Sequence, residues 1–311
     1  MLPDGWTERP ATRPDLTDVA RLVIATDVAE FGAPDWSESD QADEWADPRL
    51  DLAADTLVVH DDGGRLAGYA YVVARVAGVD FDSDTLVDPE CRVAGVEEHL
   101  MAFTERRARE QIDPAAAEPR LMAFVHAPNT ARGQRVRVAG FVPVRQFYRM
   151  TLVLDGSRVA SPVPTGVVVR DCTGVEDVRL VHALLTEAFR EHYRSVPQSF
   201  EDWSARHPHA DDDPAPWLLA EVDGVAVGAL TSSVSVPGLG WIFSVGVLRQ
   251  SRGRGIGLAL LHRAFDDLRA LGRASVSLGV DAENSSGALR LYEKAGMHVE
   301  RRFDFYAKAL G

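Results

Sequence analysis

The chain has 311 residues, of which 46% are hydrophobic and 26% are charged, as in ordinary globular proteins, and this length predicts about two domains. Its 33 basic and 47 acidic residues give a net charge of −14 at pH 7, which argues against general nucleic-acid binding because that requires a basic face. The two cysteines, Cys91 and Cys172, are distant in the sequence and make no disulfide framework, so we expect a reducing compartment.

The first residues, MLPDGWTERP, contain neither the basic region nor the apolar region of a secretory signal. No apolar run approaches the roughly 20 residues that a membrane-spanning helix needs. We therefore expect a cytoplasmic protein that has neither a membrane nor a nucleic acid as its partner.

Elements of the first half recur in the second half in the same order. Segments 7–22, 59–72, 87–101 and 139–150 parallel segments 168–180, 221–230, 247–261 and 295–306. Matching glycines lie 160 residues apart for Gly68 and Gly228, and 156 apart for Gly140 and Gly296. A repeat this long indicates duplicated domains, because the units of a solenoid are much shorter.

A linker is predicted at DGSRVASPVPTG, residues 155–166, which is rich in Pro, Gly and Ser between two apolar strands. We expect a first domain over residues 1–155, a linker over 156–166 and a second domain over 167–311.

In the second half, hydrophobic spacing predicts strands and helices in alternation. The expected elements are a strand at 167–172, a helix at 180–189, a hairpin around Asp223-Gly224, a strand at 240–247, a helix from Ile256 to Leu271, a strand at 274–280, a helix at 286–295 and a strand at 301–310. This order predicts an α/β (α+β) fold, a mixed sheet with helices on its faces.

The stretch SVGVLRQSRGRGIGLALL, residues 244–261, carries the clearest chemistry. A strand leads through a loop into a helix, and a helix start favours an anion through its free N–H groups and its dipole. Gly253, Gly255 and Gly257 let the backbone approach a ligand closely. The stretch is not a P-loop, since it has no Lys, and Leu258 replaces the third glycine of a dinucleotide fingerprint.

The remaining pattern, Arg252-x-x-Gly255-x-Gly257, resembles the R/Q-x-x-G-x-G/A loop of the GCN5-related N-acetyltransferases (GNAT), which binds the diphosphate of acetyl-CoA. A second region, VDAENSSGALRLYEKAGM at 280–297, is similar to the N-x-x-A-x-x-L-Y-x-x-x-G-F pattern of that family. With its two halves, the chain most resembles the mycothiol synthase-like tandem acetyltransferases. The resemblance implies two tandem GNAT domains.

The resemblance implies acetyl-CoA as the acetyl-donor cosubstrate and assigns its contacts. Backbone groups of the strand would hold the pantetheine and the acetyl carbonyl, and the loop and helix start would hold the diphosphate. The residues implied to bind the cofactor are Val245, Gly246, Val247, Arg252, Gly253, Arg254, Gly255, Ile256, Gly257, Leu258 and Asn284.

Tyr292 matches the tyrosine that acts as general acid in this family, where it protonates the departing thiolate. Its spacing from Ala288 and Ala295 also fits an ordinary core aromatic.

The general base stays open, because the strand GLGWIFSVGV contains no carboxylate where relatives often place a Glu. This departure also leaves a mycothiol precursor in question as the acceptor. The candidates for the base are Glu191, His192 and Asp281, and a histidine needs little adjustment to act at neutral pH. The two carboxylates also fit solvated or capping roles, and a water chain is a further possibility.

The acceptor site is expected to include His192, Phe200, Trp241 and Asp281. Phe200 and Trp203 fit either the acceptor pocket or the core, and we favour the core for Trp203 because Trp45 stands at the matching place in the first half.

The first half departs from the family where chemistry would occur. Arg92 and Gly95 remain, but Glu97 stands in place of the last loop glycine and Val136 in place of Tyr292. A negative charge at a phosphate site opposes binding. We predict that this half does not catalyse and supports the acceptor cleft.

The acidic segment RHPHADDD, residues 206–213, contains no spaced metal-ligand motif, so we predict a solvated loop and no metal. The expected function is an acetyl-CoA-dependent N-acetyltransferase for the primary amine of a small molecule, as a monomer or homodimer. The alternative is a non-catalytic acyl-CoA-binding or regulatory module of the same fold.

Overall fold

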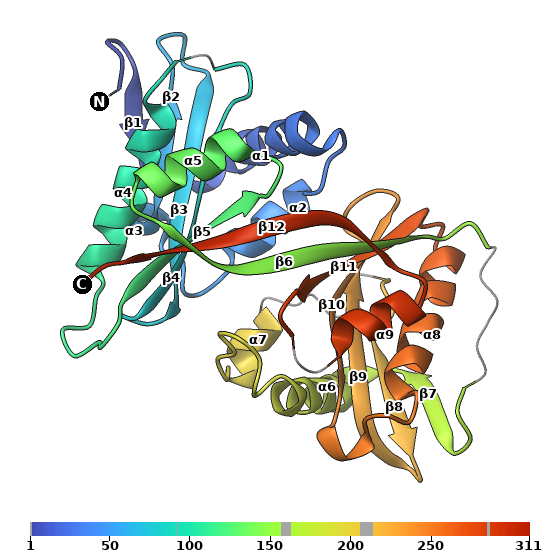
Figure 1. Cartoon of the computed structure of the whole chain (residues 1–311). Helices are drawn as coiled ribbons and strands as arrows, with labels where there is room; N and C mark the ends of the chain where they lie inside the picture. Colours follow the sequence, from blue (N-terminus) through green and yellow to red (C-terminus); the bar gives the residue numbers. More distant parts are fainter. Residues whose placement is uncertain (1, 92, 157–162, 206–213, 285–286) are drawn as a thin grey trace. The chain divides into compact units, whose positions relative to one another are not determined.

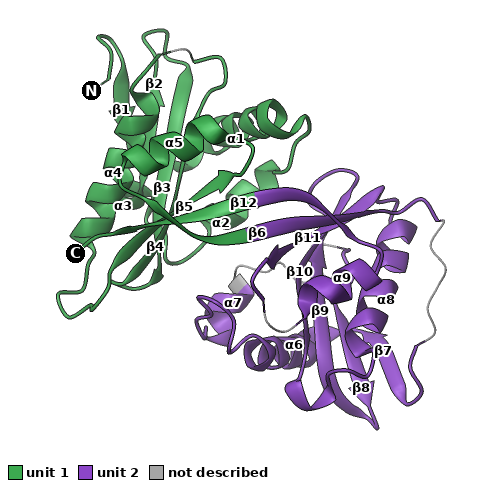
Figure 2. Cartoon of the chain, viewed as in Figure 1, with its two compact units in different colours: residues 1–146, 303–311 green, residues 147–302 purple. Residues whose placement is uncertain are grey.

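The protein is described by a computed structural model over residues 2–91, 93–156, 163–205, 214–284 and 287–311 (Figure 1). Two compact units divide the chain: unit 1 contains Met1–Gln146 and Phe303–Gly311, and unit 2 contains Phe147–Arg302 (Figure 2). Arg92, segment 206–213 and linker residues 157–162 lie outside the described residues.

Unit 1 contains one sheet in the order β1-β2-β3-β4-β5-β12, in which β4 and β5 run parallel and the other neighbours run antiparallel. Its strands are β1 (Thr7–Arg9), β2 (Thr56–His60), β3 (Leu66–Val76), β4 (Asp80–Val87), β5 (Arg120–His126) and the end of β12 (His298–Ala309). Its helices are η1 (Arg13–Asp15), α1 (Leu16–Phe31), α2 (Glu38–Trp45), α3 (Leu52–Asp55), α4 (Val96–Glu110) and α5 (Thr130–Val138).

Unit 2 repeats this topology in the order β7-β8-β9-β10-β11-β6, with β10 and β11 parallel. Its strands are β7 (Val167–Asp171), β8 (Leu218–Val222), β9 (Val225–Ser233), β10 (Leu239–Val247), β11 (Ser275–Asp281) and the end of β6 (Val142–Val153). Its helices are α6 (Gly174–Ala188), α7 (Phe200–Ala205), η2 (Arg249–Ser251), α8 (Ile256–Ala270) and α9 (Ala288–Lys294). The predicted mixed α/β sheet is confirmed.

Each unit takes its last strand from the other half of the sequence. Residues 147–153 of β6 pair with β11 in unit 2, and residues 303–309 of β12 pair with β5 in unit 1. These units differ from the expected division into 1–155 and 167–311. The reason is that strand pairing depends on non-local backbone hydrogen bonds, which a strand's own hydrophobic pattern does not specify.

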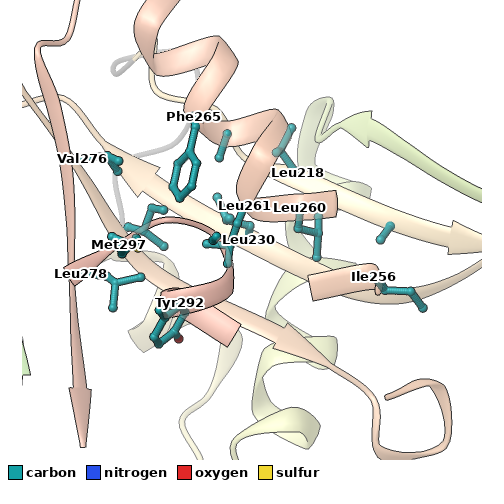
Figure 3. Packing of buried hydrophobic residues seen from close by; sticks show 14 of the residues in the cluster. Leu218, Leu230, Ile256, Leu260, Leu261, Phe265, Val276, Leu278, Tyr292 and Met297 are labelled. Carbon is teal, nitrogen blue, oxygen red and sulfur yellow. The ribbon is translucent and has the colours of Figure 1, made fainter. Parts of the chain in front are cut away.

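The core of unit 2 forms where α8 and α9 cover the sheet. Alternate residues of β11, from Val276 through Leu278 to Val280, join one cluster with the apolar face of α8, which includes Leu261 and Phe265 (Figure 3). On the opposite face of the sheet, α6 packs in a second cluster.

Local chemistry explains two element boundaries of unit 2. Asp223 and Gly224 both have positive φ, 51° and 76°, as a tight hairpin turn requires. Gly255 has φ +79° and precedes Ile256, where α8 begins as predicted. No helix within the described ranges is both long and apolar enough to cross a membrane.

Candidate active site

Strands β10 and β11 separate partway along their length. The parallel ladder joins Leu239–Ile242 to Ser275–Leu278, but the strands continue to Val247 and Asp281. Beyond Ile242 and Leu278, the facing backbone edges have no ladder partner across this gap among the described residues. A ligand that enters between the strands would meet these backbone edges.

An irregularity in β10 lies at the start of this separation. The register against β9 shifts between Ile242 and Ser244, so Phe243 is an extra residue, and its side chain is 45% exposed. A bulge bends a strand and increases its twist. It therefore turns the part of β10 that carries Val245, Gly246 and Val247 away from β11.

Gly246 also fixes a helix against the strand. A Cβ atom at Gly246 would lie 2.9 Å from Cβ of Ala188 and 3.0 Å from Cδ2 of Leu185. The glycine thus lets the C-terminal turn of α6 pack directly on the separated part of β10.

The glycine loop leads into the first turn of α8, as expected. Gly253 and Gly255 have φ of +78° and +79°, a conformation that favours glycine. At Gly257, a Cβ atom would lie 3.0 Å from Cδ2 of Leu291 on α9. Because the first amides of a helix lack intrahelical acceptors, this narrow helix start suits a diphosphate.

The buried side chains beside this helix start differ from the exposed loop. Ile256 is 1% exposed and belongs to the core cluster, and Leu258 packs against the cluster. Asn284 lies half-buried in the turn after β11, where its amide donates to the carbonyl of Asp281 at 3.1 Å. Because the side chains of Ile256 and Leu258 pack in or against the core, we expect these two residues to contact the cofactor through their backbone.

The arginines of the loop have three different surroundings. Arg249 forms an exposed ion pair with Glu191 at 3.2 Å. Arg252 donates from Nε to the Val247 carbonyl at 3.0 Å and from Nη2 to the Ala188 carbonyl at 3.1 Å. Arg254 is exposed and forms no hydrogen bond or ion pair with any residue that the structure describes.

Tyr292 of α9 lies in the core cluster beside Leu278, the last residue of β11 that pairs with β10 (Figure 3). Burial raises the pKa of Tyr292 to about 12, so the phenol is neutral at physiological pH. Within the described ranges the phenol oxygen has no hydrogen-bond partner. Tyr292 is thus a neutral phenol of the core cluster that makes no hydrogen bond with the described residues.

His192 lies just after α6, near the same gap. Its amide donates to the Phe189 carbonyl at 2.9 Å, and its ring meets the Phe189 ring edge-on at 4.4 Å between centroids. Burial lowers the pKa of His192, the positive charge of Arg252 lowers it further, and the negative charge of Asp281 opposes both. Two candidates for the base, His192 and Asp281, therefore interact with each other.

Glu191, the third candidate for the base, lies at the surface. Its side chain is 68% exposed, and its carboxylate binds Arg249. The carboxylate is thus engaged in an ion pair at the surface. This surrounding favours the solvated role for Glu191.

Asp281 ends β11 and also shapes the turn that follows. Its carboxylate accepts from the amide of Glu283 at 2.9 Å. The capping role considered from the sequence is therefore present, together with the electrostatic effect on His192.

Trp241 lies on the α6 face of the sheet with polar residues that the sequence analysis missed. The guanidinium carbon of Arg149 is 5.1 Å from the centroid of its ring, and Arg149 also pairs with Glu300 at 3.2 Å. Ser277, opposite Trp241 on β11, shares a 2.7 Å hydrogen bond with Thr151, which donates to Glu300 at 2.8 Å.

This polar row is assembled from three strands, one of which belongs to the first half of the sequence. The only sequence signal was the alternation of Arg149 and Thr151 with apolar residues in β6. Next to it, a Cβ atom at Gly279 would meet no atom within 4 Å. Open space thus adjoins Arg149, the partner of Gly279 in the ladder.

Phe200 and Trp203 lie with the N-terminal and middle turns of α6. The Phe200 ring is 4.0 Å from the Arg179 guanidinium carbon and 5.7 Å from the His182 ring. Trp203 packs against the rings of His182 and Trp217 at 5.1 and 5.6 Å. His182 precedes Ala188 by six residues, or about 9 Å of helix, so both aromatics belong to the α6–α7 packing.

In unit 1 an arginine forms ion pairs beside the corresponding separation of strands. The β4–β5 ladder covers only Asp80–Asp82 and Arg120–Met122, while both strands continue. Arg132 of α5 donates to Asp84 on the continuing part of β4 at 2.5 Å. The same guanidinium lies 3.6 Å from the carboxylate of Glu97, in the first turn of α4.

Glu97 is held by a second arginine as well. Arg135 donates from Nε to its carboxylate at 2.5 Å. By the spacing of the repeat, Glu97 and Arg135 correspond to Gly257 and Leu291 of unit 2. The close contact between Gly257 and Leu291 in unit 2 is therefore replaced in unit 1 by an ion pair between Glu97 and Arg135.

Comparison with known proteins agrees with this geometry. Residues 178–297 match the family model of the Acetyltransferase (GNAT) family. A relative named "Mycothiol acetyltransferase" from Beutenbergia cavernae is 30% identical over 256 residues, which cover 79% of this chain and 80% of the relative. The chain belongs to the GNAT acetyltransferase family. It is accordingly an acetyltransferase with two units of that fold.

Other relatives extend the similarity over more of this GNAT chain. A "Mycothiol acetyltransferase" from Cellulomonas flavigena is 29% identical and covers 93% of this chain and 84% of its own. The crystal structure of a GCN5-related N-acetyltransferase from Sphaerobacter thermophilus has a TM-score of 0.82 and 33% identity, and covers 100% of this chain and 97% of its own. A tandem GNAT protein from the clavulanic acid biosynthesis pathway shares the fold, with a TM-score of 0.73, 16% identity and coverage of 98% and 99%.

Proposed function

We propose that unit 2 transfers the acetyl group of acetyl-CoA to the primary amine of a small molecule by direct attack on the thioester. The observation that carries this proposal is the gap between β10 and β11, which opens beside the glycine-rich start of α8 and the neutral phenol of Tyr292.

In the proposed reaction, the first turn of α8 and Arg254 bind the diphosphate of the cosubstrate. Backbone amides in the separated part of β10 hold the thioester carbonyl and stabilise the negative charge that develops on its oxygen. The acceptor approaches from the α6 face, where Gly279 leaves space.

Two protons move in this reaction. His192 takes the proton of the attacking amine, as a carbon–nitrogen bond forms and the carbon–sulfur bond breaks. Tyr292 gives its proton to the departing thiolate. The products are the N-acetylated amine and free CoA, and proton exchange with water restores both side chains.

The acceptor is a small molecule with a primary amine. The substrate of the mycothiol acetyltransferases is one candidate, because those relatives cover most of this chain. Since β10 carries no carboxylate, we do not expect the base used here to lie on that strand.

We propose in addition that unit 1 neither binds acetyl-CoA nor catalyses. Glu97 occupies the start of α4, and Arg132 spans the gap that would admit the pantetheine.

The first test combines an amine panel with Tyr292→Phe. Turnover is followed by loss of thioester absorbance, because Cys91 is a half-buried free thiol that would consume a thiol reagent. We expect Tyr292→Phe to lower kcat by about 100-fold, with the Kd for acetyl-CoA unchanged. Tyr306→Phe, at a buried tyrosine of unit 1, is the matched control.

Two results would contradict this proposal. Acetyl-CoA binding without turnover of any amine favours the non-catalytic module. Equal losses of kcat and of acetyl-CoA affinity in Tyr292→Phe assign that residue to the core alone.

A further inference from the structure

We propose that Arg252 is a positioning residue, which fastens the cofactor loop to the helix that leads to His192, whereas Arg254 is the cation of the loop that meets the diphosphate. This inference rests on the proposed function and reverses the role that the loop pattern suggests for Arg252.

The contacts of Arg252 connect three elements. Its Nε donates to the carbonyl of Val247 at the end of β10, and its Nη2 donates to the carbonyl of Ala188 at the end of α6. The planar guanidinium can serve two acceptors at fixed angles. The last carbonyls of a helix have no intrahelical donor, so this bond stabilises the C-terminus of α6.

The end of α6 also packs closely against the separated part of β10. Ala188 lies against the backbone of Gly246, and Phe189 both contacts Gly246 and holds the amide and ring of His192. By binding the carbonyl of Ala188, the guanidinium of Arg252 thus helps to fix the position of His192, which follows four residues later in the chain.

The charge of Arg252 acts on His192 as well. Two charged groups affect the imidazole: Arg252 opposes its protonation, and Asp281 at the end of β11 favours it. Glu191 and Arg249 lie beside the same turn and neutralise each other in an ion pair. Loss of the Arg252 charge should therefore raise the pKa of His192.

Unlike Arg252, Arg254 is not bound to the described part of the chain. It lies two residues further, immediately before the Gly255 cap of α8, and forms no ion pair or hydrogen bond with the described part of the chain. A free guanidinium at a helix start binds phosphate by charge and by bidentate hydrogen bonds. Arg252 and Arg254 belong to the same loop and differ in their contacts, so variants of the two can be compared directly.

The test compares Arg252→Gln, Arg252→Lys and Arg254→Gln in the full chain. Acetyl-CoA affinity is measured by calorimetry at two salt concentrations. The pKa of His192 is measured by NMR titration in the absence of ligand, with its signal assigned by its loss in His192→Gln.

We expect Arg254→Gln to weaken acetyl-CoA binding by about tenfold, to reduce its salt dependence and to leave the His192 titration unchanged. Arg252→Gln should change the Kd for acetyl-CoA by less than threefold, raise the pKa of His192 and lower kcat by tenfold or more. Arg252→Lys keeps the charge but not the two fixed hydrogen bonds, so kcat should fall while the His192 titration stays near that of the unmodified chain.

The inference is overturned if Arg252→Gln weakens acetyl-CoA binding as much as Arg254→Gln does and leaves the His192 titration unchanged. The titration needs neither acetyl-CoA nor an acceptor. Failure of the proposed function would show as absent binding or turnover in the unmodified chain, whereas failure of this inference shows in the two arginine variants.

Discussion

Tyr292 and His192 receive opposite pKa shifts from the same cause. Burial disfavours the charged form of either group, so it raises the pKa of the phenol and lowers that of the imidazole. Both side chains are therefore neutral near pH 7. A neutral phenol can donate a proton and a neutral imidazole can accept one, which gives the proposed acid and base their assignments.

This predicts the pH dependence of the reaction. Since His192 must be unprotonated and its pKa is lowered, the limb of the kcat/KM profile that His192 causes should have its midpoint below the usual value of about 6.5, separate from the limb at higher pH that the amine of the acceptor causes. Tyr292 should cause no loss of rate near pH 9, since its pKa is about 12. In a kcat/KM profile, an acidic limb that persists in His192→Gln would assign the base to another group.

Glu44 of unit 1 makes a separate prediction about stability. Burial raises its pKa to about 7, against hydrogen bonds from Gln41 and Tyr71, and the charges of Asp84 and Asp47 raise it further. The folded state thus binds this proton more tightly than the unfolded chain, whose Glu pKa is about 4.3. The resulting stabilisation is complete below pH 4.3 and is lost as the pH rises through 7.

Glu44→Gln should therefore increase the free energy of unfolding at pH 8 and have a smaller effect at pH 5. Denaturant titrations at both pH values measure this, with Glu118→Gln at an exposed glutamate as the control. An equal change at the two pH values would argue against a raised pKa.

At the scale of elements, α4 and α8 begin with the same backbone geometry but differ in the residue that their first turn carries. Each follows a glycine of positive φ, Gly95 at +93° and Gly255 at +79°. The next turn carries Glu97 in unit 1 and Gly257 in unit 2. In unit 1 one carboxylate, bound by Arg132 and Arg135, lies in the first turn of the helix, where its negative charge opposes an anionic ligand.

Gly257→Glu should consequently remove acetyl-CoA binding. The new side chain would press on Leu291, which already lies 3.0 Å from a Cβ position at 257, and its charge would repel a diphosphate. Calorimetry should give one acetyl-CoA per unmodified chain and none per Gly257→Glu chain. Ala270→Glu adds the same charge at the exposed far end of α8 and is the control.

A stoichiometry of two in the unmodified chain, or one in Gly257→Glu, would show that unit 1 binds acetyl-CoA despite its internal ion pairs.

At the scale of the whole molecule, the exchanged strands decide which fragments can fold. A chain cut at residue 155 lacks residues 303–309, the neighbour of β5, and a chain begun at residue 167 lacks residues 147–153, the neighbour of β11. An exposed, unpaired edge beside a parallel strand favours aggregation.

We therefore predict that fragment 147–302 is folded and binds acetyl-CoA, whereas fragment 167–311 is not. Circular dichroism and acetyl-CoA calorimetry on the two fragments test this directly. Cooperative unfolding of fragment 167–311, together with the affinity of the full chain, would contradict the importance of the exchanged strand.

Much of the fold and the local geometry of the glycine loop followed from local pattern. Periodicity located α8 at Ile256 and the hairpin at Asp223-Gly224, because glycines of positive φ and amphipathic spacing act within a few residues. The polar row did not follow: Arg149, Thr151 and Glu300 meet beside Trp241 and Ser277 only after strands from both halves pair.

The sequence by itself thus determined the GNAT membership, the duplicated α/β elements and the glycine start of α8, since these are features of short contiguous segments. Only the tertiary structure decided which loop arginine binds backbone carbonyls and which has no partner among the described residues, which ion pairs form beside the strand separation of unit 1 and where each last strand pairs. These depend on contacts between residues that are distant along the chain, and their geometry is set by packing and non-local backbone hydrogen bonds.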